Sequence, residues 1–374
     1  MRIGFDLRPF LKEETGVGVY FRNLLFELAK IDSENEYFLF SSSWKDRFPR
    51  DRIPPFGRRR FRDVRLPVRA VDFLWYKLGW PPLDRFFGAK LDLTHSPAPV
   101  FLPTRGKKII TINDLFFLDS PDQADRGARR NFAGRVAGAV EAADGIVTIS
   151  GFSRRSILDR FPVDEKKIRV IPLGVDSEWK SEPADADLAR VRAELAPPGP
   201  FLLFVGALEP RKNLVRLVEA IKILHDRGRK VPLLIVGRPG GDSVRVRDNV
   251  ERLGLGPMVK LLGYLDAGSV RCLYRLASAL VFPSLAEGFG LPILEAMAGG
   301  LPVAASGTSA IPEVAGEAAL LFDPASPEDI AEKVGQLLDD QQLRRGLAQK
   351  GRQRAALYSW KKTAVETLEF YNAL

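Results

Sequence analysis

Cysteine, histidine and long apolar runs are scarce in this chain of 374 residues. Its single cysteine, Cys272, excludes an intramolecular disulfide and fits a reducing compartment. With only two histidines, His95 and His225, and no Cys/His cluster, we expect no metal site. No run approaches the ~18 apolar residues of a membrane span, and the opening MRIGFDLR puts Asp6 where a signal peptide needs an apolar residue. We therefore expect a cytoplasmic protein.

Negative charge is in deficit in the first half of the chain. Residues 1–175 hold 31 Lys and Arg against 22 Asp and Glu, whereas the remainder holds 25 of each. The segment Arg50–Arg69 has eight arginines and two aspartates. Aromatic residues follow it: Phe73, Trp75, Tyr76, Trp80, Phe86 and Phe87. Arginines beside aromatics suit an anionic membrane face, at which the protein would be peripheral. The alternative is a solvated arginine loop beside core aromatics; nucleic acid is not expected.

The chain is too long for one typical core and alternates between apolar strands and amphipathic helices. One series ends at a Pro/Gly hinge near residue 173, and a second series follows. This pattern predicts an α/β protein with two doubly wound parallel sheets, in domains 1–173 and 174–355. A last helix within 356–374 is expected to pack back toward the first domain. Ligands of such sheets bind beyond the carboxyl ends of the strands.

A glycine-rich segment, TGVGV at residues 15–19, follows the first expected strand. The G-x-G-x-x-G pattern of dinucleotide sites fails here because Phe21 stands where a third Gly or Ala is required. Gly16 and Gly18 still allow the backbone to approach a ligand closely, and the N-terminus of the next helix favours anions. We expect a ligand-facing loop, with a plain tight turn as the alternative.

Two cations stand between a buried strand and a helix in GALEPRKNLVRLVEAI, residues 206–221. The strand ends at Gly206, and Asn213 is typical of a helix N-cap. Arg211 and Lys212 therefore lie beyond the strand, where cations oppose the helix dipole. Arg grips phosphate oxygens in a bidentate manner and Lys adds a point charge. The segment predicts a phosphate site; the alternative is two solvated charges near an N-cap.

Two glutamates flank a Gly-Phe-Gly turn in LAEGFGLPILEAMAGG, residues 285–300. The segment follows the expected strand SALVFPS, and Pro292 suits the first turn of a helix. Side chains on a helix lean toward its N-terminus, so Glu295 should point back to the loop that holds Glu287. Gly288 and Gly290 leave backbone N–H groups to face a ligand. We expect one pocket that binds sugar or ribose hydroxyls; a solvated Glu287 and a Glu295 used only as helix-start charge are the alternative.

Together these segments resemble the retaining glycosyltransferases of family GT4, which have the GT-B fold. LAEGFGLPILEAMAGGLPV is similar to the E-x7-E region of that family, and GALEPRKNL to its donor diphosphate motif. THSP (residues 94–97) and TGVGVY resemble acceptor-domain segments of its bacterial mannosyltransferase-like members. The resemblance covers nearly the whole chain, and it implies two Rossmann-like domains that face one another across a cleft.

The resemblance implies a role for each matching residue. Arg211 and Lys212 would neutralise the pyrophosphate of a nucleotide sugar, Glu295 would hold the ribose hydroxyls, and Glu287 would hold the transferred sugar. The other donor-side residues would be Gly206, Gly288, Phe289 and Gly290, the base-lining Gly263, Tyr264 and Leu265, and Gly16 and Gly18 from the other domain. The sugar would keep its anomeric configuration through front-face attack, with the leaving diphosphate taking the acceptor proton. No metal or cofactor is implied beyond a GDP- or UDP-linked donor.

The acceptor side departs from the family at one position. Many members have His-Asp after the strand that here reads IITIND, whereas this chain has Asn113-Asp114. Asn donates a hydrogen bond but, unlike His, cannot take up a proton at neutral pH. The role of Asn113 and the identity of the transferred sugar therefore stay open. Asp114 is expected as an acceptor-side catalytic group, with a strand-end cap as the alternative. His95 is either an acceptor-binding residue or a satisfied strand-end histidine.

The sequence thus predicts a glycosyltransferase that moves a hexose, with mannose favoured, to a glycan or lipid-linked acceptor of a cell-surface polysaccharide. Two alternatives stay open. One is another GT-B enzyme, a phosphorylase or a sugar-nucleotide epimerase, of which the phosphorylase would need a pyridoxal-bearing lysine. The other is a non-catalytic basic membrane adaptor, which would be expected to lack the donor residues present here.

Overall fold

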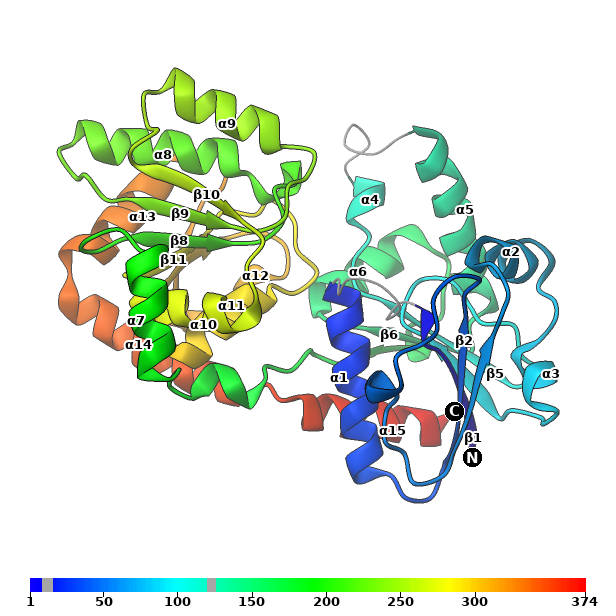
Figure 1. Cartoon of the computed structure of the whole chain (residues 1–374). Helices are drawn as coiled ribbons and strands as arrows, with labels where there is room; N and C mark the ends of the chain where they lie inside the picture. The colour runs from blue at the N-terminus through cyan, green and yellow to red at the C-terminus, as the bar shows by residue number, and fades with distance from the viewer. Residues whose placement is uncertain (9–15, 120–125) are drawn as a thin grey trace. The chain divides into compact units, whose positions relative to one another are not determined.

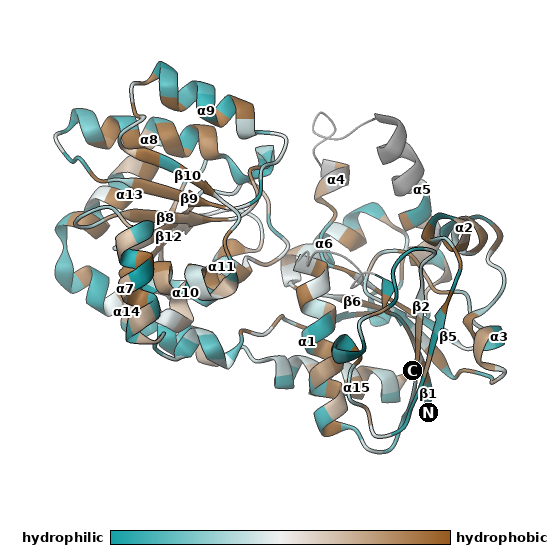
Figure 2. Ribbon diagram, in the orientation of Figure 1, coloured by the Kyte–Doolittle hydropathy of each residue, from teal (hydrophilic) through white to brown (hydrophobic). Residues whose placement is uncertain are grey.

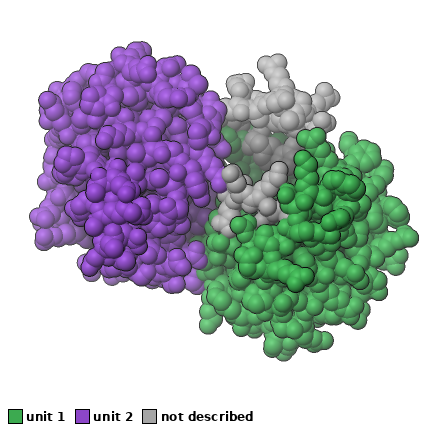
Figure 3. Space-filling view, viewed as in Figure 1, with its two compact units in different colours: residues 1–174, 360–374 green, residues 175–359 purple. Residues whose placement is uncertain are grey.

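The computed structural model describes residues 1–8, 16–119 and 126–374 and divides into two compact units (Figures 1 and 3). Unit 1 comprises Met1–Gly174 together with Trp360–Leu374, and unit 2 comprises Val175–Ser359. The boundaries expected from the sequence lay at 173/174 and 355/356; in the structure the chain changes unit at 174/175 and 359/360.

Unit 1 is built on a parallel sheet of seven strands in the order β3-β2-β1-β4-β5-β6-β7. The strands are β1 (Arg2–Asp6), β2 (Glu36–Ser42), β3 (Arg59–Val64), β4 (Leu93–Ser96), β5 (Lys107–Ile112), β6 (Gly145–Thr148) and β7 (Ile168–Val170). The helices and single turns are α1 (Gly16–Ile31), η2 (Arg50–Arg52), α2 (Val68–Phe73), η3 (Leu74–Leu78), α3 (Leu83–Phe87), α4 (Phe116–Asp119), α5 (Arg126–Ala142), α6 (Gly151–Arg160), η5 (Glu165–Lys167) and α15 (Trp360–Ala373).

The last helix, α15, belongs to unit 1 although it follows all of unit 2 in the sequence. It packs against α1, and Thr363 donates a hydrogen bond to the carbonyl of Pro172 at 2.8 Å. Gly145 in β6 has no room for a side chain, because a Cβ there would lie 2.8 Å from the ring of Phe370. The helix therefore fits closely against the sheet and closes the core of unit 1.

Unit 2 repeats the same strand order in a parallel sheet of six strands, β10-β9-β8-β11-β12-β13. The strands are β8 (Leu202–Val205), β9 (Leu233–Val236), β10 (Val259–Gly263), β11 (Ala279–Phe282), β12 (Val303–Ser306) and β13 (Ala319–Phe322). The helices and single turns are η6 (Ser177–Lys180), α7 (Asp185–Glu194), η7 (Pro210–Lys212), α8 (Leu214–Asp226), α9 (Ser243–Arg252), α10 (Ala267–Leu276), α11 (Leu291–Gly299), α12 (Ile311–Ala315), η8 (Gly316–Ala318), α13 (Pro327–Asp339) and α14 (Gln341–Ala356).

Hydropathy explains why these segments fold as they do. The central strands of unit 2 are apolar throughout and are buried on both faces by helices, as parallel sheets require (Figure 2). Helix α8 buries one stripe, which includes Leu214, Leu217, Val218 and Ile221, and exposes its polar side. Cys272 is buried in α10, as expected for a core cysteine, and the side chain of His225 is 36% exposed. The prediction of two doubly wound parallel sheets is confirmed.

One local prediction needs correction, and two strands were not predicted. Gly16–Val19 form the first turn of α1 rather than a loop before it, and Thr15 lies outside the described residues. Strand β3 was not predicted as a strand, because its sequence RRFRDV holds more charged than apolar residues; it is an edge strand with one partner, so the alternative of an arginine loop is wrong for residues 59–64. The short edge strand β13 also has a single partner and was not predicted.

Candidate functional site

The strand order of unit 2 reverses between β8 and β11, which are neighbours in the sheet. In doubly wound sheets this switch point is where the chain leaves adjacent strands in opposite directions and opens a binding crevice at their carboxyl ends. Turn η7 follows β8, and the loop 283–290 follows β11. The two segments singled out from the sequence therefore meet at the switch point.

Arg211 and Lys212 converge on Glu287 at this point. The Lys212 ammonium lies 2.6 Å from Oε1 of Glu287, and the Arg211 guanidinium lies 3.0 Å from Oε2. A second acid, Glu209, accepts from Nε of Arg211 at 2.9 Å. Lys212 and Glu287 are 6% and 9% exposed. The alternative of two solvated charges is therefore wrong for Lys212, since that cation is buried and paired.

The charge on Glu287 is set by its two cationic partners. Burial alone would raise the pKa of this carboxyl, but the charges of Lys212 and Arg211 outweigh burial and lower it. Glu287 is thus ionised at neutral pH. Its main chain is held as well, because Glu287 N donates to the Ser309 hydroxyl at 3.1 Å and its carbonyl accepts from Ala310 N. Ser309 adopts a left-handed conformation, with φ of 58°.

The side chain of Asn213 does not cap helix α8 as the sequence predicts, but links turn η7 to two other loops. Asn213 is the residue before α8, but its side chain makes no capping hydrogen bond. Its amide instead donates to the carbonyls of Pro283 at 3.1 Å and Pro324 at 2.7 Å. The residue has φ of 58°, which Asn tolerates better than most side chains. Asn213 therefore ties η7 to the loop that carries Glu287.

Glu295 lies on α11, the helix that begins after the Gly-Phe-Gly turn. The Tyr274 hydroxyl donates to its carboxylate at 3.2 Å. Burial raises the pKa of Glu295 to about 7, and Asp176 adds to the rise, although the Tyr274 hydrogen bond opposes it. Two carboxylates eight positions apart thus differ: Glu287 is ionised, whereas Glu295 titrates near neutrality.

The Gly-Phe-Gly turn itself is buried. Gly290 has φ of 106°, a backbone conformation that favours glycine, and it directly precedes α11. The ring of Phe289 is 4% exposed and packs edge-to-face against Tyr358 at 5.7 Å. The turn is therefore a rigid connection between Glu287 and the start of α11.

Glycines end three neighbouring strands of unit 2, β8, β9 and β10. Gly206 N donates to the carbonyl of Val236, and Gly237 N donates to the carbonyl of Gly263. A Cβ on Gly237 would lie 1.8 Å from the carbonyl oxygen of Gly206, and one on Gly240 would lie 2.6 Å from that of Leu208. The loops after β8 and β9 thus touch backbone to backbone. Gly237 and Gly240 belong to this edge but were missed, because single glycines carry no distinctive motif.

The expected base-lining segment lies at the end of β10. Gly263 has φ of 74°, Leu265 is half-buried, and Tyr264 is 64% exposed. The guanidinium of Arg238 stacks over the Tyr264 ring, 4.9 Å from its centroid. An exposed aromatic face with a cation beside it is a surface on which a planar base can stack. Arg238, which follows Gly237, was not predicted from the sequence.

The acceptor-side candidates Asn113 and Asp114 follow β5 in unit 1. Asp114 accepts a hydrogen bond from Phe116 N at 3.2 Å, which fits the strand-end alternative without excluding a catalytic role. The carbonyl of Asn113 accepts from the Ser153 hydroxyl at 2.7 Å. Its side-chain oxygen is buried and has no hydrogen-bond partner among the described residues. An unpartnered buried oxygen costs free energy, so this amide has capacity for a further donor.

His95 is a structural residue in this fold rather than an acceptor-binding one. It lies within β4, its side chain is fully buried, and its ring nitrogens contact the hydroxyls of Tyr371 at 2.5 Å and Thr111 at 2.7 Å. Burial lowers its pKa to about 3, so the ring is neutral. Of the two alternatives, the satisfied histidine holds. The expected contact with an acceptor is wrong, because both nitrogens are already used inside the core.

Gly16 and Gly18 lie in the first turn of α1, where Gly16 is exposed and Gly18 is buried. A Cβ on Gly16 would meet no described residue within 4 Å. Their expected contact with a donor stays a prediction.

The described part of the chain contains neither a candidate metal cluster nor a helix suited to span a membrane. Within residues 1–8, 16–119 and 126–374, no cluster of three or more His, Cys, Asp or Glu side chains has the geometry to hold a metal ion. In the same ranges, no helix combines the length and apolar character needed to cross a bilayer.

Comparisons with known proteins identify the family. The model of "Glycosyltransferase Family 4" matches residues 15–179, and that of "Glycosyl transferases group 1" matches residues 186–354. The chain is 29% identical over 391 residues to O-antigen chain mannosyltransferase B of Escherichia coli, with both chains covered in full. It is 32% identical over 231 residues to an MMP alpha-(1->4)-mannosyltransferase of Mycolicibacterium hassiacum, covering 60% of this chain and 53% of that one.

Solved structures share the fold. Sucrose-phosphate synthase of Thermosynechococcus elongatus has a TM-score of 0.76 at 22% identity, covering 100% of this chain and 98% of that one. Anabaena Alr3699/HepE, solved in complex with UDP and glucose, has a TM-score of 0.76 at 17% identity, with full coverage of both chains. Since one family model matches unit 1 and the other matches unit 2, the chain belongs to the group 1 glycosyltransferases of family GT4 and has the GT-B fold.

Proposed function

We propose that this glycosyltransferase transfers mannose from a nucleotide diphosphate sugar to a glycan or lipid-linked acceptor of a cell-surface polysaccharide, with retention of the anomeric configuration. The convergence of Arg211 and Lys212 on Glu287 at the switch point carries the proposal. The choice of mannose is supported by two relatives, an O-antigen chain mannosyltransferase and an MMP mannosyltransferase.

The donor diphosphate would bind beside the two cations. Charge-assisted hydrogen bonds from Arg211 and Lys212 to phosphate oxygens would strengthen as the diphosphate leaves and gains charge. Each such bond is worth about 1.5–3 kcal/mol. Because these cations supply the positive charge that the leaving group needs, we propose that the reaction requires no metal or cofactor beyond the donor. The proposal extends to a GDP- or UDP-linked donor.

The transfer step would proceed on one face of the sugar. The bond from the anomeric carbon to the diphosphate oxygen breaks, and a bond from the same carbon to the acceptor oxygen forms on the same side. The acceptor's hydroxyl proton passes to the leaving diphosphate. Glu287 stays ionised because its pKa is lowered, so it suits hydrogen bonds from sugar hydroxyls and stabilisation of positive charge on the ring rather than proton uptake.

The first experiment is thermal unfolding of the wild type and of Lys212→Ala with GDP, UDP, ADP and dTDP. A ligand at ~100 times its dissociation constant stabilises a protein by about 2.7 kcal/mol. We expect a shift with one nucleotide in the wild type and its loss in the variant. Transfer from the matching mannose donor, with the anomeric configuration of the product read by NMR, then tests the sugar and the retention. Formation of sugar phosphate or of an epimerised donor would instead favour the phosphorylase or epimerase alternative. A folded protein that binds no nucleotide would favour the adaptor.

We also propose that unit 1 binds the anionic face of a membrane, at which the protein is peripheral on the cytoplasmic side. Exposed apolar side chains gather within residues 65–80, which we call the arginine–apolar segment: Leu66 at 38%, Val68 at 37%, Phe73 at 58%, Leu78 at 61% and Trp80 at 53%. Trp75 is buried in the core, so only part of the expected aromatic run is available. Arg65 and Arg69 are exposed in the same segment and have no ion-pair partner among the described residues.

The arginines differ in how free they are to bind lipid. Arg60 pairs with Glu36 at 2.9 Å, and Arg58 donates to the Glu34 carbonyl at 3.0 Å. Arg65 and Arg69 are therefore the better sites to test. Arg65→Gln with Arg69→Gln should weaken binding to phosphatidylglycerol vesicles, whereas the control Arg247→Gln in unit 2 should not. Unchanged vesicle binding of the double variant would refute the membrane contact.

A further inference from the structure

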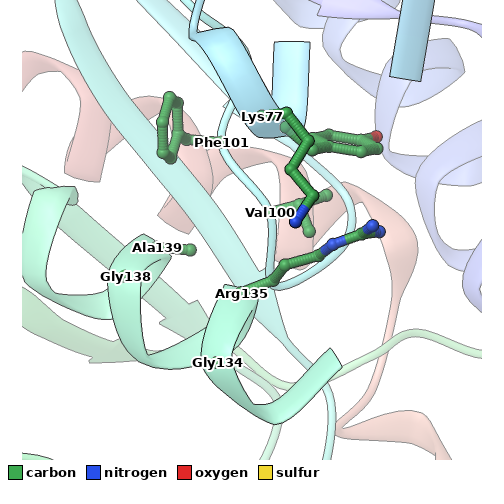
Figure 4. A pocket seen from close by; sticks show the side chains of 8 residues that line it. Lys77, Val100, Phe101, Gly134, Arg135, Gly138 and Ala139 are labelled. Carbon is green, nitrogen blue, oxygen red and sulfur yellow. The ribbon is translucent and has the colours of Figure 1, made fainter. Parts of the chain in front are cut away.

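A second pocket lies in unit 1, apart from every residue assigned to the donor (Figure 4). Its volume is about 400 Å³. Three segments form its walls: η3, the loop between β4 and β5, and the second half of α5. Neither the sequence motifs nor the transfer reaction accounts for it.

Two cations stand at this pocket. Lys77 comes from η3 and Arg135 from α5, and both side chains extend toward the same side of the pocket in Figure 4. Both residues are exposed, and neither forms an ion pair with any described residue. The nearby acid Asp72 is already bound by Arg8, at 2.9 Å. Arg135 also stacks on the ring of Tyr76, 5.7 Å from its centroid, and its charge opposes the rise that burial causes in the pKa of Asp72. The positive charge at this pocket is therefore only partly compensated by the described residues.

Apart from Lys77, Arg135 and Tyr76, the lining of the pocket has no polar side chain. It consists of Val100, Phe101 and Ala139, together with Gly134 and Gly138. The two glycines lie four positions apart on α5 and so share one helix face. Among the described residues, a Cβ on either would meet nothing within 4 Å. Glycine in a helix interior is unfavourable, so two of them without a described neighbour leave a helix surface that a ligand can approach closely.

We propose that this pocket binds the phosphate group of an amphiphilic molecule. The phosphate lies between Lys77 and Arg135, and the adjoining apolar chain lies against Phe101, Val100 and the glycine face of α5. Arg and Lys are the side chains best suited to a phosphate, and the apolar wall excludes a purely polar ligand. The arginine–apolar segment continues directly from this pocket, since η3 contributes both Lys77 to the pocket and Leu78 to that segment.

Membrane phospholipids and lipid-linked saccharides both carry this chemistry. The inference concerns binding by unit 1 alone, so it does not depend on the donor reaction. Loss of nucleotide binding in Lys212→Ala and loss of amphiphile binding at this pocket are separate outcomes.

The test is calorimetric titration of the full chain with octyl phosphate below its micellar concentration. Inorganic phosphate supplies the anion without the chain, and octyl glucoside supplies the chain without the anion. We expect octyl phosphate to bind at least about tenfold more tightly than either, since charge-assisted bonds and apolar burial each contribute that much. Equal binding of inorganic phosphate would overturn the apolar part of the inference, and equal binding of octyl glucoside would overturn the cationic part.

Two variants locate the site. Gly138→Leu fills the pocket from a position with open space, so the helix should tolerate it, and Lys77→Gln with Arg135→Gln removes the charge. Gly346→Leu is the matched control, because Gly346 is also an exposed helical glycine whose Cβ would meet nothing within 4 Å. Both pocket variants should bind octyl phosphate about tenfold more weakly, with the control unchanged. Wild-type affinity in Gly138→Leu would overturn the proposal.

Sedimentation with phosphatidylglycerol vesicles then separates the two sources. If Gly138→Leu loses vesicle binding together with octyl phosphate, the occupant is a membrane phospholipid. If it keeps vesicle binding but loses octyl phosphate, the pocket takes a single lipid-linked molecule. Either result supports a phosphate-bearing amphiphile as the ligand.

Discussion

The ammonium group of Lys212 lies 2.6 Å from a carboxylate oxygen of Glu287, although 75 positions separate the two residues in the chain. Both side chains are buried, so each charge depends on the other for compensation. In the structure, the Glu287 carboxylate pairs with both of the cations proposed to hold a diphosphate. A donor would therefore have to share these cations with Glu287.

Replacing Glu287 by Gln should lower the stability of the protein but increase its stabilisation by a nucleoside diphosphate. The variant leaves the buried Lys212 unpaired, which should lower the free energy of unfolding by about 3 kcal/mol. A nucleoside diphosphate should recover much of that loss, because its phosphates pair with the freed cations. The nucleotide-induced rise in melting temperature should thus exceed that of the wild type, while the transfer rate falls by ~100-fold.

Glu209→Gln is the control for that experiment. Glu209 also pairs with Arg211, but its side chain is 44% exposed, so its loss should change stability by less than about 1 kcal/mol. A Glu287→Gln variant whose stability and nucleotide response equal those of the wild type would show that the buried pair has no such role.

Glu295 should make the stability of the protein depend on pH near neutrality. Its pKa is about 7 in the folded protein against 4.5 for the free group. The protonated form is thus favoured by folding, and its contribution is complete below about pH 4.5 and disappears as the pH rises through 7. At about 1.4 kcal/mol per pKa unit, the loss is on the order of 3 kcal/mol.

Urea unfolding at pH 5 and pH 8 checks this prediction. Glu295→Gln mimics the protonated carboxyl and should abolish this part of the pH dependence, whereas Glu332→Gln, at an exposed site, should leave it unchanged. Nucleotide binding should show the opposite trend if the Glu295 carboxylate accepts hydrogen bonds from a ribose. Affinity should then rise with pH through about 7 in the wild type and stay flat in Glu295→Gln.

His95 should destabilise unit 1 in acid. Its pKa falls from 6.5 to about 3 because the ring is buried, so folding favours the neutral form. The stability that this provides is present above pH 6.5 and is lost as the pH falls toward 3. His95→Gln should remove that acid sensitivity, and it should also weaken the attachment of α15 through Tyr371. Denaturation followed between pH 7 and pH 4 tests this, with His225→Gln as the control; equal acid sensitivity in His95→Gln would contradict it.

The Arg8 guanidinium should contribute strongly to the stability of unit 1, at the carboxyl end of β1. This group pairs with Asp6 at 2.7 Å and Asp72 at 2.9 Å, and it stacks on Trp75 at 4.6 Å. The Arg8 side chain is 4% exposed. Arg8→Gln leaves a buried carboxylate unpaired and should cost roughly 3–5 kcal/mol of stability. Arg8→Lys should recover only part of this, because an ammonium lacks the planar fork.

Thermal melting of these variants against Arg169→Gln, an exposed arginine of β7, measures the difference. A loss in Arg8→Gln no larger than in the control would refute the role. Since Asp72 and Trp75 belong to α2 and η3, the same variant should also weaken vesicle binding by the arginine–apolar segment.

The alternation of apolar strands and amphipathic helices was sufficient to predict both sheets, because in parallel sheets buried on two faces the strands read as continuous apolar runs. Strand β3 escaped prediction because its sequence, RRFRDV, holds more charged than apolar residues, and β13 was not predicted either. Gly16 and Gly18 were misplaced because glycine is typical of turns, yet here the helix starts at the first of them.

The motifs identified two segments that meet at the switch point, because two cations after one strand and an acid after another are local features. Their binding of phosphate stays a prediction. The motifs could not reveal that Lys212 and Glu287 neutralise each other. Nor could they reveal that the Ser309 hydroxyl accepts a hydrogen bond from the Glu287 backbone, or that the Tyr371 hydroxyl contacts a ring nitrogen of His95. Each of those contacts joins residues from different strand–helix units.

The sequence by itself therefore determined the fold class, the family and the residue types at the proposed donor site, since these depend on periodicity and on short motifs. Only the tertiary structure decided how each side chain is charged and which residues it contacts. A pKa follows from burial and from neighbours across the sheet, and the strand order 3-2-1-4-5-6 that brings those neighbours together is a property of the assembled sheet.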